Sequence, residues 1–485
     1  MYDVIIVGAG PSGVMTAYEL IQKRRDLKIL LIEQGHSIKK RFCPREKMGK
    51  CINCKPVCNI TAGFSGAGAF SDGKLNSYHL SNTGVPGDIY LGGNDGGYYR
   101  KYYDIESIKD VIKYTDEVYL KFGAEPKLEG TEYQKEISEL QDKAVEADLS
   151  LVTFPIRHIG TEKTHELFTR IEDYLLEHIE IKFDTEVTDV EIKEGICSGI
   201  SVVNTYDKTK TEQIYGKHIV LAVGREGAHW LFGVCQNKGI NSSSGPIDIG
   251  IRYELPDSVM KDVNKYLYEA KFIGRVAPFK DKVRTFCQNP SGFVSTEVYD
   301  NKIVLANGHS YKNKKSENTN LAILVSHNFK TPFDRPLDYG RNVAENLNQL
   351  GNGKLVVQRL GDLLNGKRTW DHELKNNSVV PTLTDATAGD ISFALGYRTM
   401  TDIINTIKAI DKVIPGFANP DNLMYGPEIK FYSNVVEINH DFETNVKNLY
   451  CIGDGGGLTT GLIMASASGI QMGRIIDSKI KGELC

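Results

Sequence analysis

The sequence has little net charge, few cysteines and no long apolar run. No stretch of the 485 residues approaches the ~18 consecutive apolar residues that a membrane span needs, so we expect no transmembrane helix. A net charge of −4 gives no electrostatic reason to expect a nucleic-acid or anionic membrane partner. Nine cysteines, an odd number, predict reduced thiols in a cytoplasmic protein rather than a disulfide framework. The opening MYDVIIVG enters a predicted strand at once, which argues against a signal peptide.

The composition is otherwise ordinary for a globular protein, with 41% hydrophobic and 25% charged residues. The length allows two or three domains, or one cofactor domain with large insertions. The 47 glycines favour tight turns and close approach of the backbone to a ligand, so glycine-rich loops are the first candidates for a binding site.

The first 33 residues have the pattern of a strand, a helix and a second strand. YDVIIV (2–7) and KILLIE (28–33) are continuous apolar runs, typical of parallel strands buried on both faces. The loop after the first strand carries Gly8, Gly10 and Gly13 in the order G-x-G-x-x-G, and Glu33 ends the second strand, 20 residues after Gly13. In this pattern the glycines permit a tight turn and close approach of a pyrophosphate, and the acid accepts the ribose hydroxyls. The sequence therefore predicts a dinucleotide-binding unit.

Two later segments indicate FAD rather than NAD. KHIVLAVGREG (217–227) reads as a buried strand that ends at Gly224, and VKNLYCIGDGGGLTTGLIMASASG (446–469) reads as a strand, then Gly453 and Asp454, then a helix. In two-part FAD folds the latter segment returns to the first sheet, where its aspartate binds the ribityl chain. We therefore expect an α/β protein with a Rossmann-like FAD-binding domain of the glutathione-reductase type and an inserted α+β substrate domain. The predicted boundaries are 1–77 with 186–239 and 441–485 for FAD, and 78–185 with 240–440 for the insertion.

These motifs together resemble the bacterial uncharacterised FAD-dependent dehydrogenases, which are NAD(P)/FAD-dependent oxidoreductases of the two-dinucleotide-binding-domain superfamily. The resemblance covers nearly the whole chain, and CNITAGFSGAGAFSDGKL (58–75), preceded by RFCP and CINC, is its most specific part. RHIGTEK (157–163), IPGF (414–417) and CIGDGGGLTTGLIMASASG (451–469) also look like the patterns of this family. The resemblance implies bound FAD and redox chemistry without an agreed substrate. Ser65 stands where the family more often has a glycine.

The small-residue loop GFSGAGAFSDGK (63–74) lets the backbone run beside an extended ligand. Arg41 is predicted to reach the adenosine or the pyrophosphate, although a solvated charge is the plainer explanation. Asp72 and Lys74 are expected near the isoalloxazine, where they would tune the flavin or cap the next element. The predicted FAD-binding residues are Gly8, Gly10, Pro11, Ser12, Gly13, Glu33, Arg41, Gly66, Gly68, Gly224, Gly453, Asp454 and Gly461.

Several polar residues of the inserted segments are candidates for catalysis. The flavin would carry out the hydride step, and the protein would supply orientation and a proton donor or acceptor. Arg157 and His158 could bind a carboxylate and move a proton, unless His158 only fastens the loop before the next helix. His309 lies in a polar loop that needs such residues for its turn in any case. Arg252 would suit an anionic substrate or the flavin, although an ion pair would equally explain an arginine at this position. Cys287 is either a redox thiol or a structural cysteine.

Four cysteines lie close together in RFCPREKMGKCINCKPVC (41–58), with the spacing C-x7-C-x2-C-x3-C. Four thiolates could hold zinc or an iron–sulfur cluster. A thiol–disulfide relay to the flavin is a third interpretation, and thiols without a joint role are a fourth. The spacing favours a metal site, and its predicted ligands are Cys43, Cys51, Cys54 and Cys58.

The sequence therefore predicts a cytoplasmic FAD-dependent oxidoreductase, either a dehydrogenase or a reductase. It would transfer a hydride between flavin and a small organic substrate, and NADH or a ferredoxin would be candidate external electron donors. One alternative is a tRNA-modifying flavoprotein, against which the acidic net charge argues. The other is a redox-sensing flavoprotein with a cysteine-ligated metal or iron–sulfur site.

Overall fold

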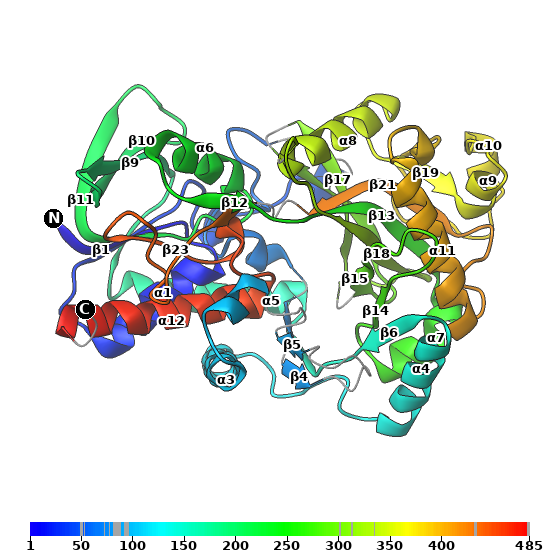
Figure 1. Ribbon diagram of the computed structural model, residues 1–485, viewed down its shortest axis with the longest axis horizontal. Helices are drawn as coiled ribbons and strands as arrows, with labels where there is room; N and C mark the ends of the chain where they lie inside the picture. The colour runs from blue at the N-terminus through cyan, green and yellow to red at the C-terminus, as the bar shows by residue number, and fades with distance from the viewer. Residues whose placement is uncertain are drawn as a thin grey trace.

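The computed structural model describes residues 1–48, 52, 54–71, 73–76, 78–80, 89–91, 97–299, 302–311, 314–333, 335–430 and 434–482. Figure 1 shows two lobes side by side, each built around its own sheet, and both chain termini lie in the first lobe. Each sheet packs on its own apolar core of buried side chains.

The first lobe is centred on a seven-stranded sheet with the order β8-β2-β1-β11-β10-β9, in which β23 also pairs with β11. The pairs β1–β2, β1–β11, β2–β8 and β11–β23 are parallel, so the three segments predicted to form the FAD domain meet in one sheet. This arrangement confirms the predicted α/β class. The strands are β1 (Tyr2–Val7), β2 (Ile29–Ile32), β8 (Glu180–Lys182), β9 (Thr185–Lys193), β10 (Ile196–Asn204), β11 (Thr211–Leu221) and β23 (Leu449–Cys451).

Helices α1 (Pro11–Lys23) and α12 (Leu462–Lys481) lie against each other beneath this sheet. Small residues bring the two backbones together, because a Cβ atom at Gly469 would overlap the carbonyl oxygen of Ser12. This close packing fixes the start of α12 beside the loop after β1.

Part of the predicted insertion belongs to the first lobe. Helices α3 (Ile105–Lys121) and α5 (Thr161–Leu176) contribute to the first apolar core. The hydroxyls of Tyr119 and Ser466 lie 2.8 Å apart, which ties α3 to α12. Strand β8 extends the first sheet at β2. The predicted segment 78–185 therefore contains elements that lie with the first lobe, since α3 packs against α12 and β8 pairs with β2.

The second lobe is centred on an eight-stranded sheet with the order β20-β19-β21-β13-β18-β15-β14-β6. Its strands are β6 (Leu149–Val152), β13 (Ile247–Pro256), β14 (Lys271–Gly274), β15 (Val283–Asn289), β18 (Asn318–His327), β19 (Val356–Arg359), β20 (Thr387–Ala388) and β21 (Leu423–Lys430). One face packs on the second apolar core, with helices α4 (Gln134–Glu146), α7 (Asp257–Tyr266), α8 (Pro336–Leu350) and α11 (Tyr397–Val413).

Strand β13 shows how the sequence separates the two faces of this sheet. Its apolar residues Ile247, Ile249 and Ile251 belong to the second core. The residues between them, Asp248, Gly250 and Arg252, therefore point to the opposite face. We call this opposite side the polar face of the eight-stranded sheet.

Shorter elements connect the lobes. A hairpin of β16 (Phe293–Tyr299) and β17 (Ile303–His309) extends from the second lobe, and β3 (Lys74–Asn76) pairs with β7 (Ile156–His158). The remaining elements are α2 (Arg45–Met48), β4 (Tyr78–Leu80), β5 (Ile89–Leu91), α6 (Ala228–Lys238), β12 (Ser242–Ser244), α9 (Leu360–Leu364), α10 (Asp371–Lys375) and β22 (Asn434–Val436). Within the described part of the chain, none of the helices combines the length and the apolar character required to span a membrane.

Candidate functional site

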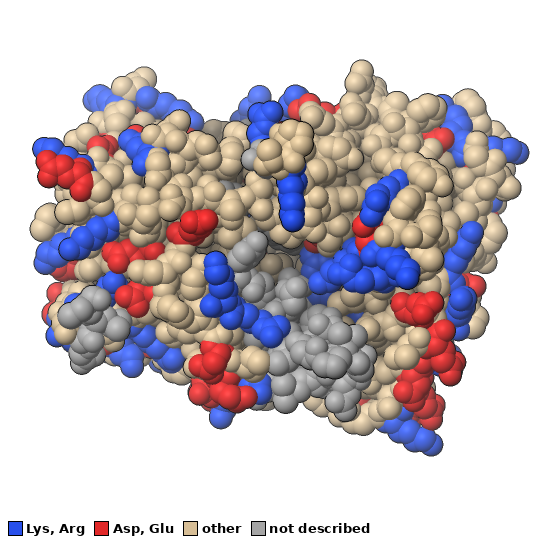
Figure 2. Space-filling model, in the orientation of Figure 1, with Lys and Arg blue, Asp and Glu red and all other residues tan. Residues whose placement is uncertain are grey.

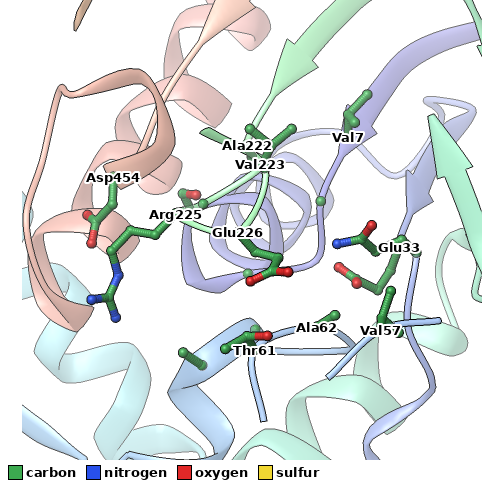
Figure 3. Close-up of a pocket in the computed structure, with 18 of the residues that line it drawn as sticks. Val7, Glu33, Val57, Thr61, Ala62, Ala222, Val223, Arg225, Glu226 and Asp454 are labelled. Atoms are coloured by element: carbon green, nitrogen blue, oxygen red, sulfur yellow. The ribbon is translucent and has the colours of Figure 1, made fainter. Parts of the chain in front are cut away.

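A cavity of about 420 Å³ lies at the carboxyl ends of β1, β2 and β11. Ligands of open α/β sheets bind at this edge of the strands. Most of the predicted FAD-binding residues line the cavity, and they come from all three segments of the first lobe (Figure 3). The residues in question are Gly8, Gly10, Pro11, Ser12, Glu33, Gly66, Gly68, Gly224, Asp454 and Gly461.

The three glycines of the first loop differ in what surrounds them. Gly8 has a φ of +100°, and a Cβ atom there would lie 2.5 Å from the carbonyl oxygen of Ala222 on the neighbouring strand segment. A Cβ atom at Gly13 would overlap the carbonyl of Gly8, so this glycine lets α1 pack on the loop and does not itself line the cavity. Gly10 has no atom within 4 Å of the position of a Cβ atom. Its surroundings leave room for a ligand.

The Glu33 carboxylate is held at the cavity wall by three backbone amides. Oε2 accepts a hydrogen bond from Ala9 at 2.9 Å, and Oε1 accepts from Gly35 at 2.9 Å and Gly63 at 2.8 Å. A carboxylate offers about four acceptor positions, so one remains for a ligand hydroxyl. The side chain is only 6% exposed, which fixes its orientation.

Arg41 does not line the cavity, contrary to the prediction that it reaches the adenosine or the pyrophosphate. Its guanidinium is buried, and it donates to the backbone carbonyls of Asn59 and Ile60, each at 2.9 Å, and of Phe64. Burial lowers the pKa of Arg41 to about 10. The side chain turns inward because the carbonyls of loop 59–64 need donors, and it therefore positions the loop that carries the cavity residues Thr61 and Ala62.

Asp454 stands where α12 begins. Its carboxylate accepts hydrogen bonds from Thr459 Oγ1 at 2.8 Å and from the amide of Gly461 at 3.2 Å. Burial raises the pKa of Asp454, and the positive charge of Arg225 opposes this shift. Figure 3 shows the Arg225 side chain beside Asp454 in the cavity. Gly453 lies behind this point, since a Cβ atom there would come within 2.6 Å of Ser12 Oγ, and it does not line the cavity.

The sequence analysis missed cavity residues of two kinds. Arg225 and Glu226 directly follow Gly224 at the end of β11, so their position in the motif could have indicated them. Glu297 and Tyr299 come from β16 of the second lobe, and no local pattern marks them. Tyr299 donates a hydrogen bond to Glu297 at 3.0 Å. Burial disfavours the charge on Glu297, but the positive charges of Lys430 and Arg225 and the Tyr299 hydrogen bond outweigh this effect and lower the pKa of Glu297.

A second group of polar side chains lies between the lobes, where β3 pairs with β7 and places Lys74 opposite His158. Lys74 Nζ donates to the carbonyl of Gln288 at 2.6 Å and lies 3.3 Å from Glu269 Oε2. His158 Nε2 is hydrogen-bonded to the Tyr268 hydroxyl at 2.8 Å. We call Lys74, His158, Tyr268 and Glu269 the interlobe cluster.

The other predicted catalytic residues lie elsewhere. The Arg157 guanidinium forms two hydrogen bonds of 2.7 Å with Asp116 and one of 2.5 Å with the carbonyl of Glu125, so it is engaged in an internal ion pair. Arg252 is fully buried on β13. It does not line the cofactor cavity and is not part of the interlobe cluster. His309 ends β17, where its ring lies 6.0 Å from that of Tyr311. The joint role of Arg157 and His158 stays a prediction, and the structure pairs the arginine with Asp116.

Three of the four clustered cysteines line one small cavity. Cys43, Cys54 and Cys58 surround it together with Thr296 and Glu297 of β16, and Cys51 lies outside the described residues. Among the residues that the structure describes, no group of three histidines, cysteines or acids is arranged to hold a metal ion. The predicted metal site therefore stays a prediction.

The comparisons with known proteins agree with a flavoprotein. Residues 247–430 match the family model described as "FAD-dependent protein, C-terminal domain-like". An uncharacterised protein of Clostridium beijerinckii is 25% identical over 500 residues, which cover 98% of this chain and 80% of that protein. The resemblance to FAD-dependent proteins is thus confirmed over residues 247–430, which lie in the second lobe.

Similar solved structures include a mutant of quinol fumarate reductase FrdA from E. coli and Sdh1 of Mycobacterium smegmatis in complex with UQ1. Both are 11% identical to this chain, with TM-scores of 0.41. The matches cover 100% and 99% of this chain, and 71% and 69% of those chains, respectively. THI4 of Thermovibrio ammonificans is 14% identical over 50% of this chain and 64% of its own, with a TM-score of 0.27. These similarities are too low to define the fold, which follows from the strand order of this chain.

The residues of the cavity fit FAD. Glu33 retains one acceptor position, and Gly10 borders open space. Both α1 and α12 begin at the cavity, so the positive N-terminal end of each helix and its first backbone amides face a ligand. Such donors suit phosphate and flavin oxygens, and an extended cavity reaching from Glu33 to Asp454 suits a dinucleotide.

Proposed function

We propose that this protein is an FAD-dependent oxidoreductase that transfers a hydride between flavin and a small organic substrate. The observation that carries the proposal is a single cavity lined by the first glycine loop, the end of β11 and the start of α12. Residues far apart in the sequence converge there, with the side chains and the glycines that a bound dinucleotide requires.

Each part of the cavity has a role in holding the cofactor. Glu33 would accept a ribose hydroxyl of the adenosine, and the loop at Gly10 with the N-terminus of α1 would hold the pyrophosphate. Asp454 would receive the ribityl chain, and the N-terminus of α12 would face the flavin. Bound FAD would supply the acceptor or donor of the hydride. The protein itself binds, orients and shields the reactants.

The interlobe cluster would serve the proton side of the reaction. His158 and the Tyr268 hydroxyl share a hydrogen bond, so a proton can be held on either partner and passed to a substrate that contacts them. Lys74 is fixed by Gln288 and Glu269, and it orients this end of the small-residue loop toward the second lobe. Ser71 lines the cofactor cavity and Lys74 belongs to the proposed proton site, so the same loop contributes to both, although Asp72 itself lies outside the described residues.

The test is the flavin content of two glycine variants. Gly10→Val adds a side chain where no protein atom lies within 4 Å, so the protein should fold and lose FAD. Gly233→Val in α6 is the matched control, because its Cβ position is also free of neighbours but lies outside the cavity. The expected result is a purified wild type and control with flavin absorption bands and a folded, colourless Gly10→Val. Equal flavin content in all three would contradict the proposed site.

The cysteine cavity favours a second candidate, a redox-sensing flavoprotein. Cys43, Cys54 and Cys58 share a cavity that Glu297 and Thr61 also line, and both of these residues line the cofactor cavity. A ligand or modification at the thiols would thus act on the wall of the cofactor site. Metal analysis of protein purified without oxygen tests it: stoichiometric zinc or iron, lost in Cys54→Ser, is expected. Metal-free protein whose flavin does not respond to thiol oxidation would reject this candidate.

A further inference from the structure

The polar face of the eight-stranded sheet carries buried charges, unlike an ordinary solvent-facing side. The charged residues that point to it are less than 9% exposed, and they are Asp248, Arg252, Glu254, Lys271, Arg284, Glu428 and Lys430. Burial of a charge is costly unless partners compensate it. The concentration of such groups on one face therefore calls for a functional explanation.

Three cations of this face converge on one aromatic ring. The Phe286 ring centre lies 5.7 Å from Lys271 Nζ, 5.3 Å from Arg284 Cζ and 5.9 Å from Lys430 Nζ. The cations come from the neighbouring strands β14 and β15 and from β21, which β13 and β18 separate from β15. Arg284 is paired with Asp248, and Lys430 lies 3.0 Å from Glu428, so acids hold two of the cations in position around the ring.

Two buried donors beside these cations lack a hydrogen-bond acceptor. Arg252 Nη1 and Asn320 Nδ2 belong to fully buried side chains, and within the described residues neither atom has a hydrogen-bond partner. The nearest acid to Arg252 Nη1 is Glu428, at 3.6 Å. A buried donor without an acceptor destabilises the fold. Both donors lie on the polar face, because Arg252 Nε donates to Asn320 Oδ1 at 2.7 Å.

The polar face adjoins both parts of the proposed active site. Lys430 acts electrostatically on Glu297, which lines the cofactor cavity. On the other side, Lys74 of the interlobe cluster is hydrogen-bonded to Gln288, two residues after Phe286 on β15. Figure 2 shows exposed Lys and Arg atoms gathered near the middle of the molecule, on the side of the second lobe, in addition to the buried cations of the polar face. A positive field at this place would attract an anionic substrate toward the cofactor.

We propose that the polar face around Phe286 binds the oxyanion group of the substrate, a carboxylate or a phosphate. Lys271, Arg284 and Lys430 supply charge-assisted hydrogen bonds, and the partly buried Phe286 ring contacts the apolar part of the same molecule. Arg252 and Asn320 lie beneath β17 on the same face and support this group of cations from below. This inference rests on the proposed function and names the substrate class for it.

The test is isothermal titration calorimetry of the FAD-containing protein with benzoate, with inorganic phosphate and with uncharged benzamide. Saturable binding of benzoate or phosphate is expected, and benzamide should not bind. The oxyanion that binds more tightly distinguishes a carboxylate from a phosphate as the recognised group. Comparable binding of benzamide and benzoate, or no binding of either oxyanion, would overturn the inference.

The variants locate the site. Lys271→Gln should weaken oxyanion binding about tenfold, as expected for the loss of one charged hydrogen bond, whereas Lys271→Arg should stay near wild type. Lys261→Gln, on the exposed side of α7, is the matched control. Lys430→Gln gives an independent loss variant if Lys271→Gln does not fold. Wild-type affinity in both loss variants would overturn the inference. Flavin absorption of the same samples separates this result from a failure of the proposed FAD site.

Discussion

The Tyr268 hydroxyl and His158 Nε2 are hydrogen-bonded at 2.8 Å, and the two ring centres lie 4.2 Å apart. His158 ends β7, one of the strands that connect the lobes, whereas Tyr268 precedes β14 in the second lobe. The contact therefore joins the lobes at the point where Lys74 also reaches across to Gln288. A proton site assembled in this way depends on how the two lobes dock.

Tyr268→Phe removes one side of this hydrogen bond without changing the size of the ring. We expect hydride transfer to slow by about 100-fold, in the lower part of the range for general acid–base catalysis, with FAD content unchanged. The pH profile of the reaction should also change, because His158 loses the partner that shares its proton. Stopped-flow reduction of the flavin measures both effects. Tyr266→Phe on α7 is the control, and equal losses in the two variants would reject a specific role for Tyr268.

Arg41→Gln should weaken FAD binding although Arg41 lies outside the cavity. The substitution removes charge-assisted hydrogen bonds to three carbonyls of loop 59–64, and each such bond contributes about 1.5–3 kcal/mol. Urea unfolding should show a lower free energy of unfolding, and fluorescence titration should show a higher Kd for FAD. The exposed Arg25→Gln should match wild type in both measurements. Unchanged FAD affinity in Arg41→Gln would show that the loop holds its shape without the arginine.

Gly308→Ala should destabilise the protein by about 1–3 kcal/mol, the usual cost of overpacking. A Cβ atom at Gly308 would overlap Arg252 Nη2 and Asn289 Oδ1, so β17 must carry a glycine to lie against the polar face. Gly233→Ala in α6 meets no neighbours and should stabilise its helix by about 0.5–1 kcal/mol. Urea unfolding distinguishes the opposite signs. Similar stability of the two variants would mean that β17 and Arg252 are not in tight contact.

Asp402 gives the stability of the second lobe a defined pH dependence. Burial and the neighbouring Asp281 raise the pKa of Asp402 to about 6, whereas Arg398 opposes the shift and lowers the pKa of Asp281. The folded state therefore retains a proton that the unfolded chain releases near pH 4. This proton contributes stability at low pH, and the contribution is lost as pH rises from about 4 to about 6.

Asp402→Asn should remove this dependence, because an amide does not titrate. Urea unfolding between pH 4 and pH 7 should show the wild type losing stability relative to Asp402→Asn as pH rises, with no further change above the pKa. His327 lies near Asp281, and burial lowers the pKa of this histidine, so its own titration falls mainly below that of a free histidine. Parallel pH curves for the two proteins would contradict the assignment.

The first lobe could be predicted from local sequence patterns. One contiguous unit contains β1, the glycine loop, α1, β2 and Glu33, and the spacing of its residues determines its geometry. The spacing of Asp454 and Gly461 likewise determines their positions at the start of α12. These residues line the cavity because each motif carries its own backbone constraints. The parallel pairing of β11 with β1, and of β23 with β11, follows from their apolar runs.

The contacts between lobes could not be predicted in this way. Glu297 and Tyr299 reach the cofactor cavity only because the hairpin of β16 and β17 folds over the first lobe. Arg41 has the position of a ligand-binding arginine, but the unpaired carbonyls of loop 59–64 turn it inward. Arg157 pairs with Asp116, which lies on a helix whose packing no motif specifies. Each of these outcomes depends on tertiary neighbours rather than on spacing.

The cavity that extends from Glu33 to Asp454 is proposed to bind FAD. A titration of cofactor-free protein with FAD and with FMN tests this most directly. FMN lacks the adenosine part that Glu33 and the glycine loop would hold. We predict one FAD per chain and at least about 100-fold weaker binding of FMN, which corresponds to about 2.7 kcal/mol. Flavin fluorescence gives both constants. Equal affinity for FMN and FAD, or no binding of either, would contradict the account.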